Sequence, residues 1–498
     1  MKDLKTRAIR GGVAKIFSQV ANFTLRIGSL MALARLLDPK DFGLVGMVTA
    51  FTGVLNLFRD FGLSSATVQR AEVSDEQVST LFWINTLVGV ILSILLVAAA
   101  PLVSMFYSEP RLLWVTIVLA LGFFLNALGV QHSAMLQREM RFGALALIEV
   151  IALVVSIAVG IGMALKGFKY WSLVGMTIST PLVTSAMLWL ATGWVPGGPR
   201  RKSGTQAMMK FGGTVTLNVL VVYVAYNLEK VLLGRFWGAE TVGIYGRAYQ
   251  LINIPTDNLN SAVGEVAFSV LARVQNDENR RRSYFLKGYS LVLALTVPIT
   301  FACAFFGQDL IMVLLGPKWK EAVPIFRLLA PTILMFAMMN PFSWLLFSMG
   351  WVKRSLRIAL VIAPLAITAY LLGLPYGPKG VALAYSTAMT LWLVPHILWC
   401  VHGTNISFRD VLNVVRRPLV SAAVAAAIAF ALQFQFGQSL SPLFRLVLSC
   451  GILFGVYALM LLYVMGQKTF YVDLVRNLRR RRATEGDSMA LDLARAGE

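Results

Sequence analysis

Apolar runs long enough to cross a lipid bilayer recur from one end of this chain to the other. A membrane-spanning helix needs ~20 predominantly apolar residues. Only 14% of the 498 residues are charged, against roughly 25% in a typical soluble domain. We predict an all-α polytopic membrane protein with about fourteen transmembrane helices. The predicted spans are 11–36, 42–66, 79–106, 112–136, 143–165, 170–192, 207–234, 240–270, 285–311, 322–348, 355–374, 380–401, 415–435 and 443–466.

The distribution of basic residues tests this topology. The net charge is +21, which in a soluble protein would suggest a nucleic-acid partner. If the N-terminus is cytoplasmic, 30 of the 45 Lys and Arg residues fall in predicted cytoplasmic segments and 11 in outer loops. This alternation follows the positive-inside rule and holds to the end of the chain. We therefore expect an even number of spans, both termini in the cytoplasm, and no nucleic-acid partner.

An internal repeat appears at an offset of 200 residues. Segment 33–46 resembles segment 233–246, and the shared residues are Leu33 with Leu233, Arg35 with Arg235, Gly43 with Gly243, and Gly46 with Gly246. The pattern predicts a helix, a short outer turn, and a second helix whose glycines allow another helix to approach closely. The offset covers six helices, an even number, so the two copies share one orientation, as in transporters built from two similar bundles.

The repeat divides the chain into parts. We predict an N-terminal six-helix lobe over 1–195, a cytoplasmic linker over 196–204 and a C-terminal six-helix lobe over 205–402. Two additional helices occupy 403–466, and a basic cytoplasmic tail follows over 467–498. The linker is rich in proline, glycine and basic residues, which is typical of a break between helical bundles.

Enzyme chemistry has little support in the sequence. The three cysteines lie in apolar runs, and the three histidines lie apart from any nucleophile or metal-ligand spacing. No Walker motif is present for ATP hydrolysis. Membrane enzymes of polysaccharide assembly usually place acid–base groups in a large outer loop, and here the outer loops are short. We therefore expect no enzyme, no catalytic residue, no metal and no cofactor.

Several segments resemble a known family of transporters. They are 35–43, 61–70, 243–251 with Pro255, and 316–319 with Pro324. In these segments the chain is similar to the polysaccharide-transporter branch of the multidrug/oligosaccharidyl-lipid/polysaccharide exporter superfamily. Within this branch it most resembles Wzx-type flippases of lipid-linked oligosaccharides, particularly the WzxC-like group. The resemblance covers nearly the whole chain.

The resemblance implies a bacterial inner-membrane flippase. Such a protein moves undecaprenyl-diphosphate-linked oligosaccharide repeat units from the cytoplasmic to the periplasmic leaflet for exopolysaccharide, capsule or O-antigen assembly. The expected mechanism is alternating access by rocking of the two lobes. Membrane lipids are expected partners, and the resemblance allows polysaccharide polymerase machinery as another. Two alternatives stay open, namely a cation-coupled multidrug exporter of the same superfamily and a lipid II flippase.

Charged residues inside the predicted spans are candidates for the substrate site. Each costs ~2.5–3.5 kcal/mol on insertion scales and usually faces a cavity or a partner. Four cations lie on the first, second, seventh and eighth spans, at Arg26, Arg59, Lys230 and Arg247. We predict that they form a cationic cavity for the substrate diphosphate, which guanidinium groups bind well. The alternative pairs Arg59 with Asp60, Lys230 with Glu229, and Arg247 with Asp257.

Other residues near the spans have weaker signals. The acids Asp257 and Glu149 are candidates for proton or sodium coupling. We expect Arg35 and Arg235, at the outer ends of their helices, to anchor helices or bind lipid phosphate. Trp319 lies near a span end and is expected to anchor the protein at the membrane interface, with stacking on a sugar as the alternative.

Overall fold

The structure is a computed structural model, and it describes the backbone of residues 2–59, 74–198, 206–275, 277–436 and 440–468. Side chains are described for the same residues except 2–17, 206–222, 224, 225, 257–262, 265 and 266. Every regular element in this part of the chain is a helix, which confirms the predicted all-α fold. The predicted tail beyond residue 468 and linker residues 199–204 lie outside the described residues.

The first helices follow the predicted spans. They are α1 Lys2–Leu36, α2 Pro39–Asn56, α4 Asp75–Tyr107, α5 Arg111–Arg138, α6 Phe142–Leu165 and α7 Tyr170–Thr192. The second predicted span runs to residue 66, and its part from 60 onward lies outside the described residues. Ser74 caps α4, because its Oγ accepts a hydrogen bond from the backbone N–H of Gln77 at 3.3 Å.

A single glycine divides α8, which covers Gln206–Arg273. Gly238 has φ 82° and ψ 179°, a backbone conformation that is essentially restricted to glycine. Two helical segments result, which we name α8a (206–237) and α8b (239–273). They correspond to the predicted spans 207–234 and 240–270.

Prolines break the predicted span 322–348 into α10 Ala322–Leu329, α11 Pro331–Met339 and α12 Pro341–Ser348. Proline lacks the backbone N–H that would continue the helix, and its ring clashes with the preceding turn. The remaining helices are α9 Glu278–Leu314, η1 Pro317–Trp319, α13 Val352–Gly373, η2 Leu374–Tyr376, α14 Gly377–Val401, α15 Phe408–Phe436, α16 Pro442–Leu459 and η3 Met460–Val464.

Nine helical stretches of the described part are long and apolar enough to cross a membrane. This makes the chain a multi-pass membrane protein. Helices α1, α2 and α8 are not among the nine. Two of them, α1 and α8, contain the predicted first, seventh and eighth spans, which are the least hydrophobic of the predicted set. The total of fourteen spans stays a prediction.

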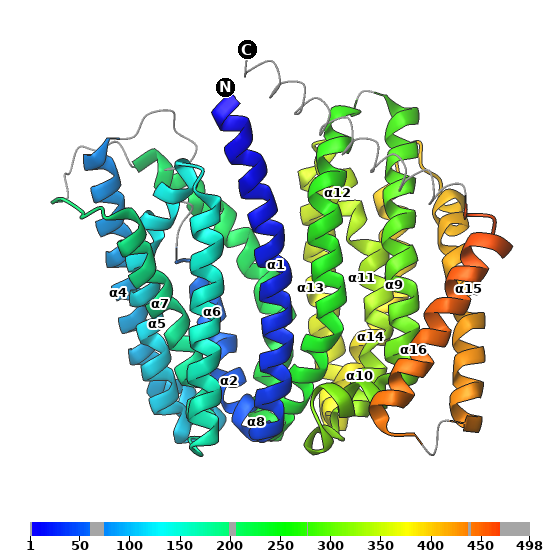
Figure 1. The fold of residues 1–498 in the computed structure, drawn as a ribbon, viewed down its shortest axis with the longest axis horizontal. Helices are drawn as coiled ribbons and strands as arrows, with labels where there is room; N and C mark the ends of the chain where they lie inside the picture. Colours follow the sequence, from blue (N-terminus) through cyan, green and yellow to red (C-terminus); the bar gives the residue numbers. More distant parts are fainter. Residues whose placement is uncertain (1, 60–73, 199–205, 276, 437–439, 469–498) are drawn as a thin grey trace, which may run out of the picture. The chain divides into compact units, whose positions relative to one another are not determined.

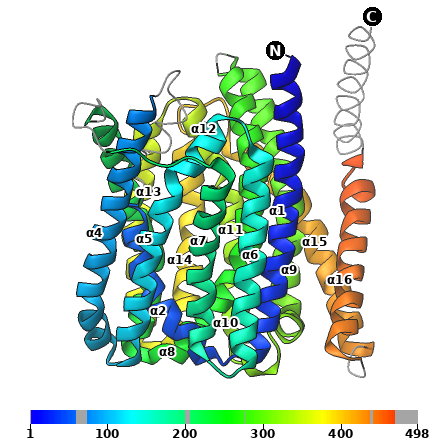
Figure 2. The same ribbon diagram turned by 60° about the vertical axis from the view of Figure 1, so that its left-hand side comes forward.

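The chain forms two compact units, which we describe separately. Unit 1 contains Met1–Gln250, Ile311–Leu329 and Leu356–Ala388; unit 2 contains Leu251–Leu310, Ala330–Ser355 and Met389–Glu498. In unit 1, α4 packs on α5, α5 and α6 pack on α7, and α1 packs on α6 (Figures 1 and 2). The division of the sequence into lobes 1–195 and 205–402 stays a prediction.

Within unit 2, α15 and α16 are attached to α9 by a buried ion pair and an apolar cluster. Asp309 is only 2% exposed and accepts hydrogen bonds from Arg445 Nε at 2.9 Å and Gln433 Nε2 at 2.7 Å. Removing one partner of a buried ion pair costs ~3–5 kcal/mol because it leaves the other charge buried and uncompensated, so Asp309 requires Arg445 beside it when α15 and α16 pack on α9. The apolar cluster consists of Ala302, Phe306, Ala426, Ala429 and Leu453.

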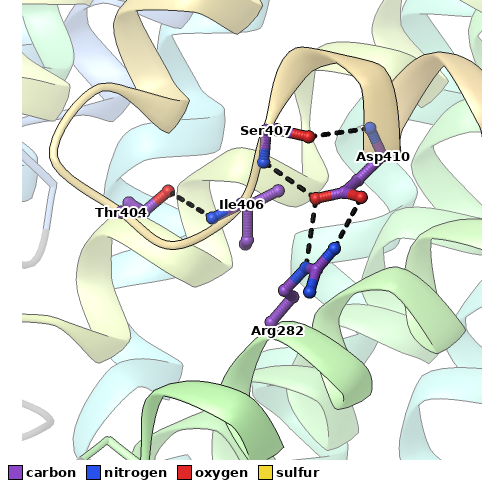
Figure 3. Close-up of polar contacts among 5 residues, drawn as sticks. All are labelled: Arg282, Thr404, Ile406, Ser407 and Asp410. Carbon is purple, nitrogen blue, oxygen red and sulfur yellow. Dashed lines mark hydrogen bonds and ion pairs between the residues drawn. The ribbon is translucent and has the colours of Figure 1, made fainter.

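The connection from α14 to α15 is fixed to the first turns of α9 (Figure 3). Asp410 accepts hydrogen bonds from Arg282 Nε at 3.1 Å and Nη2 at 2.6 Å, a bidentate ion pair. The same carboxylate accepts a hydrogen bond from the Ser407 N–H at 2.9 Å, and Ser407 Oγ accepts one from the Asp410 N–H at 3.2 Å. These reciprocal bonds cap the first turn of α15.

In unit 1, α2 and α8b cross in direct backbone contact at two glycines. A Cβ atom on Gly43 would lie 1.6 Å from the carbonyl oxygen of Ala239, and one on Gly243 would lie 1.9 Å from that of Pro39. The contact is reciprocal under the 200-residue offset, because Pro39 and Gly43 correspond to Ala239 and Gly243. Both clashes would involve backbone atoms, which cannot rotate away.

Alanine substitutions at Gly43 and at Gly246, another glycine of the repeat, should have different effects on thermal stability. Gly43→Ala should lower the apparent melting temperature of the purified protein, because overpacking costs ~1–3 kcal/mol. A Cβ on Gly246 would meet nothing within 4 Å, so Gly246→Ala should leave the melting temperature unchanged or raise it. Thermal unfolding in detergent measures both. Equal melting temperatures for Gly43→Ala and wild type would contradict the crossing geometry.

Candidate functional site

Unit 1 encloses a cavity of about 620 Å³ between α1, α2, α5, α6, α7 and α8b. This volume lies within the range of small-molecule sites, ~300–1,000 Å³. Apolar side chains such as Leu30, Phe42 and Leu173 form part of its wall. Its polar lining consists of Arg26, Ser29, Thr49, Thr52, Asn56, Asn126, Thr177, Thr180, Thr184, Arg247 and Gln250.

The cavity is positively charged. Two of its lining residues, Arg26 and Arg247, carry guanidinium groups, and among the side chains that the structure describes none of the lining residues is Asp or Glu. Guanidinium groups remain protonated in proteins. Charges of one sign in a cleft with low-dielectric walls concentrate ions of the opposite sign. The arrangement therefore favours an anionic ligand.

Arg247 is held in place from two sides. It lies one turn after Gly243 in α8b, and its guanidinium carbon sits 4.3 Å from the centroid of the Phe42 ring on α2. Such cation–π contacts contribute ~0.5–2 kcal/mol. The Nη1 atom also donates a hydrogen bond to Oε1 of Gln250, one turn further on. These contacts orient the guanidinium and leave it in the cavity wall.

Arg26 belongs to α1 and has no side-chain partner among the residues that the structure describes. It shares one helix face with Ser29, Leu30 and Leu33, as the spacing of three, four and seven residues requires. All four line the cavity. Its side chain is exposed in the structure, so the guanidinium is available to a ligand.

The neutral polar residues of the lining were missed by the sequence analysis. Thr49 Oγ1 donates to the carbonyl of Gly46 at 2.9 Å, and Thr177 Oγ1 donates to that of Leu173 at 2.8 Å. Their hydroxyl protons are used within the helix, which leaves oxygen lone pairs as acceptors. Asn126 on α5 adds an amide. The sequence signal would have been polar residues within strongly apolar runs.

The other predicted site residues lie elsewhere. Arg59 follows α2, is half-buried, and is not among the lining residues of the cavity. Lys230 Nζ donates a hydrogen bond to Asn227 Oδ1 at 2.8 Å. Glu149 is exposed on α6 outside the cavity lining. The side chain of Asp257 lies outside the described residues.

The two repeat arginines hold helix ends together within unit 1. Arg35 Nη2 donates a hydrogen bond to the carbonyl oxygen of Val313 at 2.8 Å. Arg235 lies over the Phe106 ring at 5.8 Å. Both contacts join segments that are distant in sequence, at the predicted outer end of the helices.

The predicted interfacial role of Trp319 is wrong. Its ring is fully buried, and Nε1 donates a hydrogen bond to the carbonyl oxygen of Ala34 at 2.8 Å. The ring packs edge-on against Phe42 with centroids 5.2 Å apart. An ion pair between Lys318 and Asp38 at 2.8 Å closes the same junction. Trp319 therefore supports the ring that contacts Arg247.

Thiol labelling tests the charge of the cavity. We expect a Thr180→Cys variant, with the three native cysteines replaced by alanine, to react faster with an anionic than with a cationic methanethiosulfonate reagent. Removing one unit charge nearby changes such a preference by ~1 kcal/mol, about fivefold in rate. Arg247→Ala should therefore reduce the ratio by about that factor.

A thiol at exposed Ser441, which lies in unit 2 and outside the cavity lining, is the matched control. Its reactivity ratio should not respond to Arg247→Ala. An unchanged ratio at Thr180→Cys would show that Arg247 does not determine the potential in the cavity.

The sequence matches one family model and several known proteins. The family model described as "Polysaccharide biosynthesis protein" matches residues 32–324. The teichuronic acid biosynthesis protein TuaB of Bacillus subtilis is 31% identical over 67% of this chain and 68% of its own length. The lipopolysaccharide biosynthesis protein WzxC of Escherichia coli is 26% identical over 74% of this chain and 76% of its own length.

A solved structure shares the fold. The lipid II flippase MurJ in its inward closed conformation superposes with a TM-score of 0.72 and 16% sequence identity. The match covers 94% of this chain and 100% of that chain. At this level of identity the likeness concerns the arrangement of helices alone.

Proposed function

Because the chain belongs to the family of polysaccharide biosynthesis proteins, we propose that it is a flippase for undecaprenyl-diphosphate-linked oligosaccharides. It moves these repeat units from the cytoplasmic to the periplasmic leaflet of the bacterial inner membrane for the assembly of exopolysaccharide, capsule or O-antigen. The observation that carries this proposal is a cavity lined by Arg26 and Arg247, with no acidic residue among its described lining side chains.

The diphosphate is the part of the cargo that the arginines recognise. A planar guanidinium can form two parallel hydrogen bonds to a phosphate group, and such charge-assisted bonds are about twice as strong as neutral ones. Arg26 is free to turn toward a ligand, whereas Arg247 is oriented by Phe42 and Gln250. One arginine thus offers a preformed contact, and the other adapts to the headgroup.

The neutral polar residues that line the cavity suit the sugar portion of the cargo. Sugar hydroxyl groups donate and accept hydrogen bonds, and the threonine oxygens and asparagine amides of the cavity can do the same. The prenyl tail carries no polar group, so it stays in the lipid. The protein then lowers the cost of moving the headgroup across the apolar core, which is the high barrier of the reaction.

Alternating access by two lobes is the mechanism that fits the repeat. The reciprocal contact of Gly43 with Ala239 and of Gly243 with Pro39 supports a local twofold relation between the two copies. The lobes 1–195 and 205–402 would open the cavity to one side at a time. In this proposal both termini lie in the cytoplasm, and membrane lipids and polymerase machinery are the expected partners.

Only one of the two alternatives has a cargo of the opposite charge. A multidrug exporter for cationic drugs needs acidic groups in its cavity, and the part of this lining that the structure describes contains none. A lipid II flippase moves the same kind of diphosphate, so the arginines do not separate it from an oligosaccharide flippase. The family match and the relatives from polysaccharide pathways favour the oligosaccharide.

Alanine substitution of the two arginines tests the proposal. Each charge-assisted hydrogen bond contributes ~1.5–3 kcal/mol, so Arg26→Ala or Arg247→Ala should lower headgroup affinity by about 10–100-fold. In a deletion strain, either variant should export little polymer and accumulate lipid-linked oligosaccharide on the cytoplasmic leaflet. Polymer in the medium and the lipid-linked intermediate are both measured.

The matched control is Arg416→Ala. Arg416 is exposed on α15 and does not line the cavity, so this variant should export polymer like wild type. Immunoblots of membranes confirm equal protein levels. Normal export by both Arg26→Ala and Arg247→Ala would rule out the cationic cavity as the substrate site.

A further inference from the structure

Glu229 on α8a is a buried carboxyl that forms no salt bridge with any cation in the described part of the chain. Its side chain is 0% exposed, and neither carboxyl oxygen has a hydrogen-bond partner among the described residues. The backbone N–H groups of Glu229 and Lys230 approach the carboxyl without reaching hydrogen-bond geometry. The ion pair with Lys230 considered from the sequence is not formed, because Lys230 Nζ bonds to Asn227 instead.

Helices α8b and α13 each contribute a tyrosine that interacts with this carboxyl of α8a, and α14 contributes Tyr385, which stacks on Tyr370 of α13. At the predicted outer end, Trp237 Nε1 donates a hydrogen bond to the carbonyl oxygen of Leu374 at 2.9 Å, and its ring lies 3.2 Å from the Cβ position of Gly377. Glu229 and Tyr245 each lie eight residues from Trp237 along the chain, which is ~12 Å of helix. The carboxyl therefore sits about two to three turns below this junction.

Three tyrosines, Tyr223, Tyr245 and Tyr370, interact electrostatically with the carboxyl. Tyr370 on α13 stacks on Tyr385 on α14 with ring centroids 5.1 Å apart. The hydroxyls of Tyr245 and Tyr385 are buried and lack a partner among the described residues. Among the described residues, the titratable groups that interact with Glu229 are Lys230 and Tyr223 on α8a, Tyr245 on α8b and Tyr370 on α13. Tyr226 on α8a, Tyr249 on α8b and Tyr385 on α14 interact in turn with Tyr370.

These surroundings favour the neutral acid. A carboxylate removed from water without a paired charge or hydrogen bonds is expensive, and such a group binds a proton instead. A sodium ion is a poorer occupant, because hard cations need several oxygen ligands in one shell. No described oxygen or nitrogen atom is in hydrogen-bonding position to the carboxyl.

Helix α8b separates this carboxyl from the cavity. Tyr245 belongs to the cluster around Glu229, whereas Arg247 lines the cavity. Two residues apart on a helix lie ~200° apart, on nearly opposite faces. One helix therefore presents a cation to the cavity on one side and contacts the surroundings of a buried acid on the other.

We propose that Glu229 is a proton-binding site whose occupancy is linked across α8b to occupancy of the cavity. Uptake of a proton converts the carboxylate to the neutral acid; release leaves one negative charge on Glu229 and returns the proton to water. An anion bound at Arg247 disfavours a second negative charge nearby, so anion binding and proton uptake favour each other. This linkage rests on the proposed function for the identity of the anion.

Infrared spectroscopy of the purified protein in lipid membranes tests the proton site directly. At neutral pH the wild type should show the carbonyl stretch of a buried protonated carboxyl, and Glu229→Gln should lose it. Glu149→Gln is the matched control, because Glu149 is exposed, and should keep the band. Glu229→Asp, which retains a titratable group, should keep a shifted band.

Two infrared results would overturn the proton site. One is a spectrum of Glu229→Gln identical to that of the wild type. The other is a band that disappears when choline in the buffer is replaced by sodium ions, which would assign the site to sodium. Gel filtration of each variant confirms that it is folded.

Calorimetry tests the linkage, with undecaprenyl diphosphate as the probe. Binding to the wild type, measured at the pH where its infrared band has half of its full intensity and in two buffers with different ionisation enthalpies, should take up protons. Glu229→Gln should still bind the probe but lose this proton uptake. Equal uptake by both proteins, or binding to the wild type without uptake, would overturn the linkage.

The experiments distinguish a failure of the proposed function from a failure of the proton site at Glu229. If the wild type does not bind the probe, the proposed function is wrong, and the infrared band still decides whether Glu229 carries a proton. If the probe binds and Arg247→Ala abolishes binding while the infrared band is absent, the cationic cavity stands and the proton site is wrong.

Discussion

The backbone contact between α2 and α8b at Gly43 and Gly243 determines the geometry of the candidate site. Carbonyl oxygens of each helix occupy the space where the other would carry a Cβ atom, so neither helix can slide by one turn without a clash. Phe42 precedes the first glycine and Arg247 follows the second by one turn. This register places the guanidinium over the aromatic ring at 4.3 Å.

The charged groups Arg26, Arg247 and Glu229 of unit 1 lie in two different environments. Arg26 and Arg247 lie in the wall of a cavity, where they can meet water or an anion. Glu229 lies beyond α8b among tyrosines, where it meets neither. A cation can remain charged in such a cavity, whereas a buried carboxyl without a partner is more stable as the neutral acid. Helix α8b therefore lies between a cavity suited to an anion and a carboxyl suited to a proton.

Much of this could be predicted from local patterns. Span positions followed from the lengths of apolar runs, and Gly238 falls between two predicted spans, whereas the proline breaks within the predicted span 322–348 were not predicted. Arg26 and Arg247 could be identified because a cation in an apolar run costs free energy on membrane insertion and usually faces a cavity or a partner. The same argument also selected Arg59 and Lys230, which lie outside the cavity lining.

The sequence by itself determined the helices, their periodic faces and the rare charges among them, because these depend on neighbours within a few turns. Only the tertiary structure decided what each face meets. The hydroxyls of Thr49 and Thr177 bond within their own helices, so nothing local indicates that both line one cavity. The partners of Trp319 lie some 285 residues away along the chain. Glu229 and Tyr370 likewise share a buried cluster only because helices far apart in sequence pack together.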